Sequence, residues 1–146
     1  MSFTFRFRAL AIAFVSGALF AVSCSQPVLE PESCIAARDS VKRLYSLYLD
    51  TEVGSKDQRL AVVRNLLSQR LFDELSQQQA VEIDYMTQSK DMPKAARVGA
   101  CNAANGETRF EVLLFWRKDE VNIETRVLAT LKNQNGWVTD RVTKSN

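Results

Sequence analysis

Apolar residues follow three different spacings along this chain of 146 residues. An uncharged run fills positions 9–22, apolar positions then recur every three or four residues, and from Ala95 onward apolar and polar residues alternate. Recurrence every three or four residues is typical of amphipathic helices, and alternation is typical of strands with one buried face. The pattern therefore predicts an apolar N-terminal segment, then a helical region, then a β region.

The first segment has the features of an export signal, because Arg6 and Arg8 precede the uncharged run. The run is shorter than the roughly 20 apolar residues of a membrane-spanning helix. It is followed by Cys24, and Ala21-Val22-Ser23-Cys24 resembles the lipobox of bacterial lipoproteins. The resemblance implies that residues 1–23 are removed and that Cys24 carries lipid on its sulfur and amine. The alternative is an ordinary secretory signal cut after Ala21 or Ser23, which would leave Cys24 as a disulfide partner.

Several acyl chains on one residue give stable anchoring, because each buried methylene contributes about 0.8 kcal/mol. Residues 24–33, which include Pro27 and Pro31, are expected to form a lipidated tether, and residues 34–146 a single domain. No aspartate follows Cys24 as an inner-membrane retention signal. We therefore expect a location in the cell envelope, anchored in the outer membrane and facing the periplasm, with the inner membrane left open.

Three helical stretches are predicted before the β region. The first begins at Glu32 and Ser33 and ends near Asp50, and the second covers Lys56 to Leu67. The third follows Ser68 as N-cap and continues through residues 85 and 86 until Pro93 closes it. The apolar positions of the first stretch are Ala37, Val41, Leu44, Tyr45 and Tyr48.

The β region is predicted to be a meander of about four antiparallel strands, with Asn105-Gly106 and Asn135-Gly136 as turns and Trp137 to Thr143 as the last strand. A hairpin loop at Lys118-Asp119 would place apolar residues opposite one another on one face. The expected pairs are Trp116 with Val121, Leu114 with Ile123, Phe110 with Val127 and, on the other face, Glu111 with Arg126. Helices followed by strands indicate an α+β fold, with two to three helices packed on the sheet.

Three segments resemble the nuclear transport factor 2-like (cystatin-like) superfamily, whose α+β fold is cone-shaped. They are 41–48 (VKRLYSLY), 67–71 (LSQRL) and 135–142 (NGWVTDRV). The resemblance spans about Cys34 to Thr143 and is closest to small exported bacterial members of unknown function. It implies the fold and no activity, since the superfamily includes isomerases, dehydratases, secretion-system scaffolds and binding modules.

Charge and composition exclude several classes of function. The chain has no histidine and a formal net charge of +2, and removal of Arg6 and Arg8 would leave 17 basic and 17 acidic residues. A neutral domain gives no reason to expect nucleic acid as a partner. The absence of histidine excludes Ser-His-Asp and Cys-His catalysis and the Asp-His pair of some dehydratases of the superfamily. We expect no cofactor and no metal.

Two of the three cysteines remain once Cys24 is assigned to lipid. Export favours a disulfide, and in the fold that the chain resembles the first helix packs across the sheet, so a bond between Cys34 and Cys101 is expected. The alternative is a pair of free buried thiols.

The interior of the cone is where enzymes of this superfamily place an acid or base beside a tyrosine. The pocket candidates are Tyr45, Tyr48, Asp84, Tyr85 and Trp116. Aromatic residues at helical spacing are more often core than catalytic, so we expect no enzyme. A periplasmic small-ligand binder that uses the cone pocket and a histidine-independent enzyme remain as alternatives.

The outward face of the predicted sheet offers the other candidate site. Leu113, Phe115 and Leu128 point away from the main apolar stripe, among charged residues that include Glu111 and Arg126. An apolar centre with a charged rim is typical of protein interfaces. We therefore expect a lipoprotein with an interaction or assembly role, whose partner is another envelope protein or a second copy of the chain.

Overall fold

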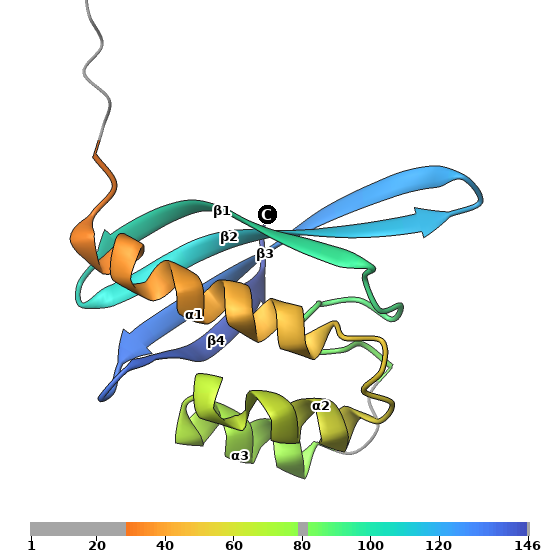
Figure 1. The fold of residues 1–146 in the computed structure, drawn as a ribbon, viewed down its shortest axis with the longest axis horizontal. Coiled ribbons are helices and arrows are strands. Elements are labelled where there is room, and N and C mark those ends of the chain that lie inside the picture. The colour runs from red at the N-terminus through yellow and green to blue at the C-terminus, as the bar shows by residue number, and fades with distance from the viewer. Residues whose placement is uncertain (1–28, 79–81, 146) are drawn as a thin grey trace, which may run out of the picture.

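The computed structural model describes residues 29–78 and 82–145, so the export signal and Cys24 lie outside the described residues. Within the described part, helices come first and four strands follow (Figure 1). The strands form one antiparallel sheet in the order β1-β2-β3-β4. The domain is therefore α+β with an antiparallel meander, as the hydrophobic pattern predicts. None of the described helices is long and apolar enough to span a membrane.

Helix α1 (Glu32–Tyr48) forms where the first apolar stripe predicts it. Pro31 precedes the first turn, and the carboxylate of Glu32 lies at the end of the helix where the dipole favours negative charge. The stripe packs on the sheet and is buried. Its buried residues are Cys34, Ala37, Val41, Leu44, Tyr45 and Tyr48.

Two shorter helices follow, each beginning at a serine N-cap. Helix α2 (Lys56–Val63) has a reciprocal capping box, in which the Gln58 N–H donates to Ser55 Oγ and the Ser55 N–H donates to Gln58 Oε1. A 3-10 turn η1 (Arg64–Leu66) leads to α3 (Gln69–Gln77), where the Leu71 N–H donates to Ser68 Oγ. Both helices lie on the same side of the sheet as α1 (Figure 1).

The prediction that the third helix continues through Tyr85 and Met86 is wrong. Helix α3 ends at Gln77, and residues 82–92 form turns with one isolated bridge between Asp84 and Ser89. The Asp84 carboxylate accepts hydrogen bonds from the N–H groups of Met86 and Thr87, at 2.9 and 3.0 Å. Such local bonds compete with helical hydrogen bonding, and they hold this segment in a turn.

The four strands are β1 (Ala95–Ala104), β2 (Glu107–Lys118), β3 (Val121–Asn133) and β4 (Trp137–Lys144). The expected register of β2 and β3 is wrong by two residues, because the turn is Asp119-Glu120, both residues having positive φ, and not Lys118-Asp119. Trp116 therefore pairs with Ile123. A shift of two residues keeps every side chain on its expected face. Glu111 and Arg126 become diagonal neighbours, and their side chains still form an ion pair at 3.3 Å.

The helices and the inner face of the sheet enclose one apolar core. Its largest fully buried side chains include Tyr45, Tyr48, Phe110, Met86 and Leu114. Helices α1 and α3 contact the sheet, α2 packs on α1 and α3, and none of the described helices lies on the other face (Figure 1). One side of the sheet therefore belongs to the core, and no helix of the described residues packs on the other side.

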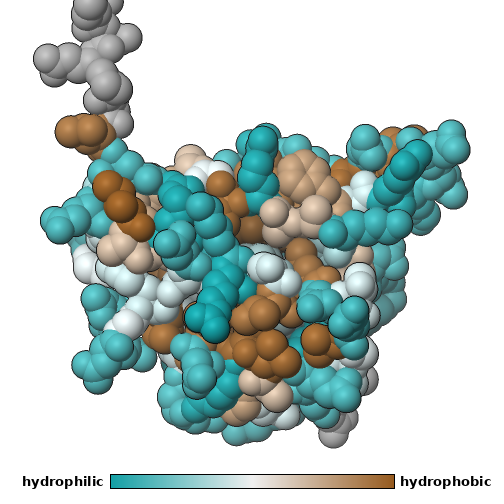
Figure 2. All heavy atoms as spheres, viewed as in Figure 1, coloured by the Kyte–Doolittle hydropathy of each residue, from teal (hydrophilic) through white to brown (hydrophobic). Residues whose placement is uncertain are grey.

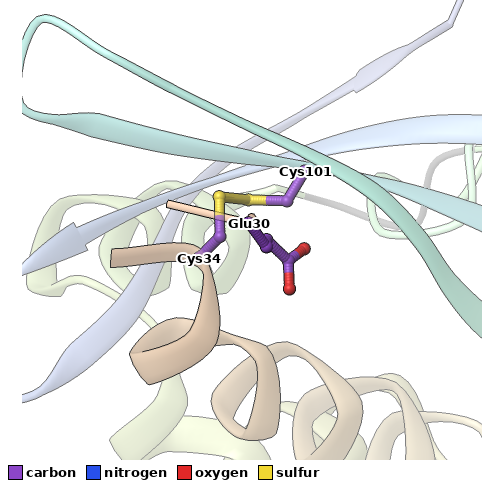
Figure 3. Close-up of side chains that lie close together, drawn as sticks. All are labelled: Glu30, Cys34 and Cys101. Carbon is purple, nitrogen blue, oxygen red and sulfur yellow. A yellow bond between two sulfur atoms is a disulfide. The ribbon is translucent and has the colours of Figure 1, made fainter. Parts of the chain in front are cut away.

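Cys34 and Cys101 form a disulfide bond, which confirms the expected pairing. Cys34 lies in the first turn of α1, and Cys101 follows an irregularity in β1 between Val98 and Cys101 (Figure 3). Their Cα atoms are 6.0 Å apart. The bond ties the start of the first helix to an edge strand 67 residues further along the chain.

Loss of this bond should destabilise the domain strongly. The chain-entropy model for a closed loop of 67 residues gives about 4 kcal/mol. We expect a Cys34→Ala/Cys101→Ala variant to lose about that much free energy of unfolding in a urea titration. Wild type under reductant should fall to the level of the variant, and a variant as stable as oxidised wild type would contradict the prediction.

Candidate functional site

The two helix tyrosines expected to line a pocket are core residues. Tyr45 is 1% exposed, and its hydroxyl donates to the Met86 carbonyl at 3.0 Å. Tyr48 is also 1% exposed and donates to Asp84 Oδ2 at 2.6 Å. Burial first, and then the nearby Asp84 carboxylate, raise the pKa of both hydroxyls above their ordinary value. Both tyrosines therefore remain protonated donors that tie α1 to residues 84–86.

Asp84 is held by the fold through several hydrogen bonds. Besides Tyr48, it accepts bonds from the Met86 N–H, the Thr87 N–H and the Thr87 hydroxyl, the last at 3.2 Å. A carboxylate with four donors organises a turn and has little capacity left for a substrate. The Tyr48–Asp84 contact is thus best explained as a structural link between α1 and the segment before the sheet.

The five pocket candidates do not share one cavity. One surface hollow of about 320 Å³ is lined by Tyr48, Asp84 and Tyr85. Tyr45 borders a separate groove between α1 and β1. Trp116 lines a third hollow near the β2–β3 hairpin. The Trp116 Nε1–H donates to the Asp91 carbonyl at 2.9 Å. The space between α1 and the sheet is filled by core side chains.

Sequence reasoning missed Arg59, which contributes to the hollow at Tyr48. The Arg59 guanidinium lies 5.7 Å from the centre of the Tyr48 ring and donates to the Gly54 carbonyl. Only the packing of α2 beside α1 brings the two together. No local motif in the sequence could have predicted that contact.

One group among the described residues has metal-ligand chemistry. Glu30 lies beside Cys34 and Cys101 (Figure 3). Both sulfur atoms are in the disulfide and cannot act as thiolate ligands, and the Glu30 carboxylate forms an ion pair with Arg38. This group therefore stabilises the junction of α1 and β1.

The outer face of the sheet, defined here by Leu113, Phe115 and Leu128, has an apolar centre. Leu113 is only 6% exposed although it does not belong to the core, whereas Phe115 and Leu128 are half-buried. Leu113 is shielded in part because its Cδ1 approaches Gly99 so closely that a Cβ there would lie 2.9 Å away. Phe115 and Leu128 are therefore the apolar side chains that this face offers to a partner.

Charged side chains surround this centre. The Arg126 guanidinium contacts Glu111 and Glu124, both at 3.3 Å. The Arg97 guanidinium lies 6.0 Å from the centre of the Phe115 ring. The predicted arrangement of Leu113, Phe115 and Leu128 with Glu111 and Arg126 is therefore present on one face.

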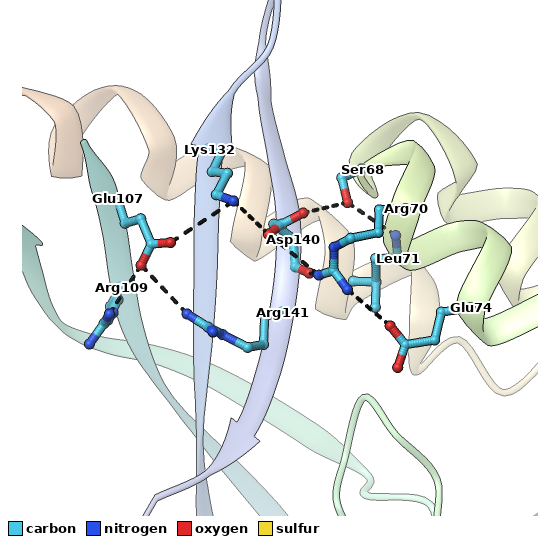
Figure 4. Close-up of polar contacts among 9 residues, drawn as sticks. All are labelled: Ser68, Arg70, Leu71, Glu74, Glu107, Arg109, Lys132, Asp140 and Arg141. Carbon is cyan, nitrogen blue, oxygen red and sulfur yellow. Dashed lines mark hydrogen bonds and ion pairs between the residues drawn. The ribbon is translucent and has the colours of Figure 1, made fainter. Parts of the chain in front are cut away.

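The rim continues into a polar network that reaches α3 (Figure 4). The Glu107 carboxylate lies 3.0 Å from Arg109 and also forms ion pairs with Lys132 and Arg141. The hydrogen bond from Arg109 is the main cause that lowers the pKa of Glu107. Lys132 bridges this cluster to Asp140, with its Nζ 2.9 Å from Asp140 Oδ2.

Asp140 joins β4 to the start of α3. Ser68, the N-cap of α3, donates to Asp140 Oδ1 at 2.8 Å, and Arg70 lies 3.4 Å from Oδ2 (Figure 4). Burial opposes ionisation of Asp140, but the hydrogen bonds from Lys132, Ser68 and Arg70 outweigh it and lower the pKa of the carboxyl. One carboxylate thus links the helical layer to the rim of the outer face.

The comparisons with known proteins concern the fold only. No family model and no curated protein matches the chain. Among solved structures, the chain is similar to the Ntf2-like potential transfer protein TraM from the Gram-positive conjugative plasmid pIP501, with 11% identity over 75% of this chain and 97% of that chain and a TM-score of 0.48. It is also similar to RPA3114, a SEC-C motif containing protein from Rhodopseudomonas palustris, with 12% identity over 80% of this chain and 79% of that chain and a TM-score of 0.31.

The network at Asp140 predicts a pH dependence of stability. Because the pKa of Asp140 is lower in the folded than in the unfolded chain, its carboxylate stabilises the fold at neutral pH. That contribution is lost as the pH falls from about 4 through the lowered pKa. Asp140→Asn should therefore cost about 2 kcal/mol at pH 7 and little near pH 2, measured by urea unfolding across pH. Asp119→Asn, at the exposed hairpin turn, should change neither value, and an equal loss for Asp140→Asn at both pH values would contradict the prediction.

Proposed function

We propose that the chain is an exported, lipid-anchored domain that binds another protein of the cell envelope through the outer face of its sheet. The observation that carries the proposal is this face, where Phe115 and Leu128 lie within a charged rim and no described helix covers them. An apolar centre surrounded by charged residues is typical of a non-obligate interface. The α+β fold is compatible with such a role and does not by itself imply it.

The charge of the face favours a different protein over a second copy. Glu107, Glu111 and Glu124 already pair with arginine or lysine, while no carboxylate among the described residues forms an ion pair with Arg97 or Arg117. Two copies placed face to face would bring these arginines together. A partner with carboxylates around an apolar centre would complement them.

Export is supported by two independent features. The N-terminal sequence has a basic region, an uncharged run and a lipobox-like end at Cys24. The Cys34–Cys101 disulfide is typical of proteins that fold in oxidising compartments such as the periplasm. Anchoring in the outer membrane, facing the periplasm, is part of the proposal, and it is supported by the lack of an aspartate directly after Cys24.

A non-enzymatic role is supported by the geometry of the interior. The Tyr48 hydroxyl and the Asp84 carboxylate are used in structural hydrogen bonds. The filled space between α1 and the sheet also disfavours a small ligand bound inside the cone. The three hollows that contain pocket candidates are open at the surface. Trp116 lines one, Tyr45 lines another, and the third is lined by Tyr48, Asp84 and Tyr85.

Lipid anchoring is tested at Cys24. We expect wild type expressed in a Gram-negative host to sediment with membranes, and its mature form to begin at residue 24 with the mass of attached acyl chains. Cys24→Ser should lack the acyl mass and the cleavage before residue 24, because the sulfur that receives lipid is gone. Ser25→Ala is the matched control and should behave as wild type. An unmodified Cys24 in the mature protein would refute the anchor.

The outer face is tested by Phe115→Asp. We expect crosslinking in native membranes to yield a specific adduct with wild type and at least about tenfold less with Phe115→Asp, because a carboxylate replaces the apolar centre. Ile123→Asp is the matched control, since Ile123 is an exposed apolar residue on the opposite face of the same hairpin. Equal crosslinking by both variants would count against this face. Circular dichroism should show both variants folded.

A further inference from the structure

The two edges of the sheet differ in what covers them. At the β4 edge, Leu67 forms a bridge with Thr139 and the Ser68 N–H donates to the Thr139 carbonyl at 2.8 Å, so the chain itself occupies part of that edge. At the β1 edge, the hydrogen bond that a described residue outside the sheet makes to the strand's main chain is a single one, from Arg38 Nη1 to the Gly99 carbonyl at 3.0 Å. The part of β1 before Gly99 therefore presents outward N–H and C=O groups that no described residue binds.

A groove of about 510 Å³ runs along this open part of the edge, between β1 and the C-terminal half of α1. Its apolar residues are Tyr45 and Leu49 from the helix side and Ala96 and Val98 from the strand. In Figure 2, apolar atoms reach the surface in the region between α1 and β1. The groove thus combines a free strand edge with apolar contacts for alternate side chains of an added strand.

The charged residues of the groove all have the same sign. Lys42, Lys94 and Arg97 line it, and no aspartate or glutamate does. Lys42 lies 4.0 Å from Asp39, but both side chains are largely exposed, so that pair neutralises little. A segment with several carboxylates would complement these three cations.

We propose that the groove binds an extended acidic segment of a partner protein, which adds to the sheet as a strand beside β1. The main-chain groups of residues 95–98 would pair with the segment, its apolar side chains would contact Ala96, Val98 and Leu49, and its carboxylates would contact Lys42, Lys94 and Arg97. This site is an edge that shares Arg97 with the outer face, and a variant of Ser46 tests it separately from the interface centred on Phe115.

A second copy of this chain fits the groove poorly. Strand β1 has the sequence AARVGACNAA and contains no acidic residue. Antiparallel pairing of two β1 strands would bring Arg97 and Lys94 of one copy near the same residues of the other, which is unfavourable. The charge of the groove therefore favours a segment from a different protein.

The test uses the full-length chain purified in detergent and a short fluorescein-labelled peptide in which glutamate alternates with valine. We expect saturable binding by fluorescence anisotropy that weakens with added salt. A peptide in which lysine replaces glutamate should not bind. Hydrogen exchange should show new protection at amides within residues 95–98 when the acidic peptide is bound.

Two pairs of variants locate the site. Ser46→Trp places a bulky side chain in the groove from an exposed position of α1, and we expect it to weaken peptide binding at least about tenfold. Ser76→Trp, at an exposed position of α3 outside the groove, is the control and should leave the peptide affinity unchanged. Lys94→Glu/Arg97→Glu should weaken binding similarly, whereas Arg117→Glu/Lys118→Glu near the hairpin turn should leave it within about twofold.

Several outcomes would overturn the proposal. They are absence of binding by the acidic peptide, equal binding of the lysine peptide, and unchanged affinity in Ser46→Trp. Concentration-dependent dimers that protect the same amides without peptide would assign the groove to a second copy instead. Unchanged crosslinking by Phe115→Asp, with peptide binding intact, would refute the outer face and leave the groove.

Discussion

The junction of Cys34 with Cys101 is the constraint on which the arrangement of α1 and the sheet depends. The bond holds the first turn of α1 against β1, and the rest of α1 then crosses the inner face of the sheet, with its apolar stripe against Phe110 and Leu114. Glu30 and Arg38 add an ion pair at the same place, and Arg38 also donates to the Gly99 carbonyl of β1. This end of the helix is fixed to the edge strand at Gly99 and Cys101, and the groove lies along the part of β1 before Gly99.

A second link holds the other end of α1. Tyr45 and Tyr48 donate to residues 84–86, a segment whose turn is organised by the Asp84 carboxylate. These tyrosines are pocket candidates in the sequence because the resembling superfamily uses the interior of its cone for chemistry. The structure gives both of them a structural role instead. A buried tyrosine hydroxyl needs an acceptor, and Asp84 and the Met86 carbonyl supply it. The groups that could have made an acid–base site are thus used to position α1.

The order of the elements and the faces of the strands could be predicted from the sequence, because they depend on hydrophobic periodicity, which is local. The register of β2 and β3 could not, because Asp119-Glu120 is an unusual pair for a turn with two positive φ angles. The end of α3 was missed for a related reason. Apolar residues at positions 85 and 86 continue the helical spacing, while the hydrogen bonds that the Met86 and Thr87 N–H groups donate to the Asp84 carboxylate favour a turn. Trp116 and Tyr48 line different hollows, although both are pocket candidates in the sequence. Their separation depends on tertiary packing, which a local sequence pattern does not report.

The uneven covering of the sheet connects the fold with the proposed role. The helices cover one face, the chain itself occupies part of the β4 edge, and no described helix covers the outer face or the β1 edge before Gly99, which lie next to one another. Arg97 belongs to both open surfaces, since it lines the groove and its guanidinium also lies over Phe115. On the proposed function, residues 24–31 would keep the start of α1 within roughly 28 Å of the bilayer, since an extended residue spans about 3.5 Å. A lipid-anchored partner within this distance would meet both open surfaces at high effective concentration, so that modest contacts at each could suffice for stable binding.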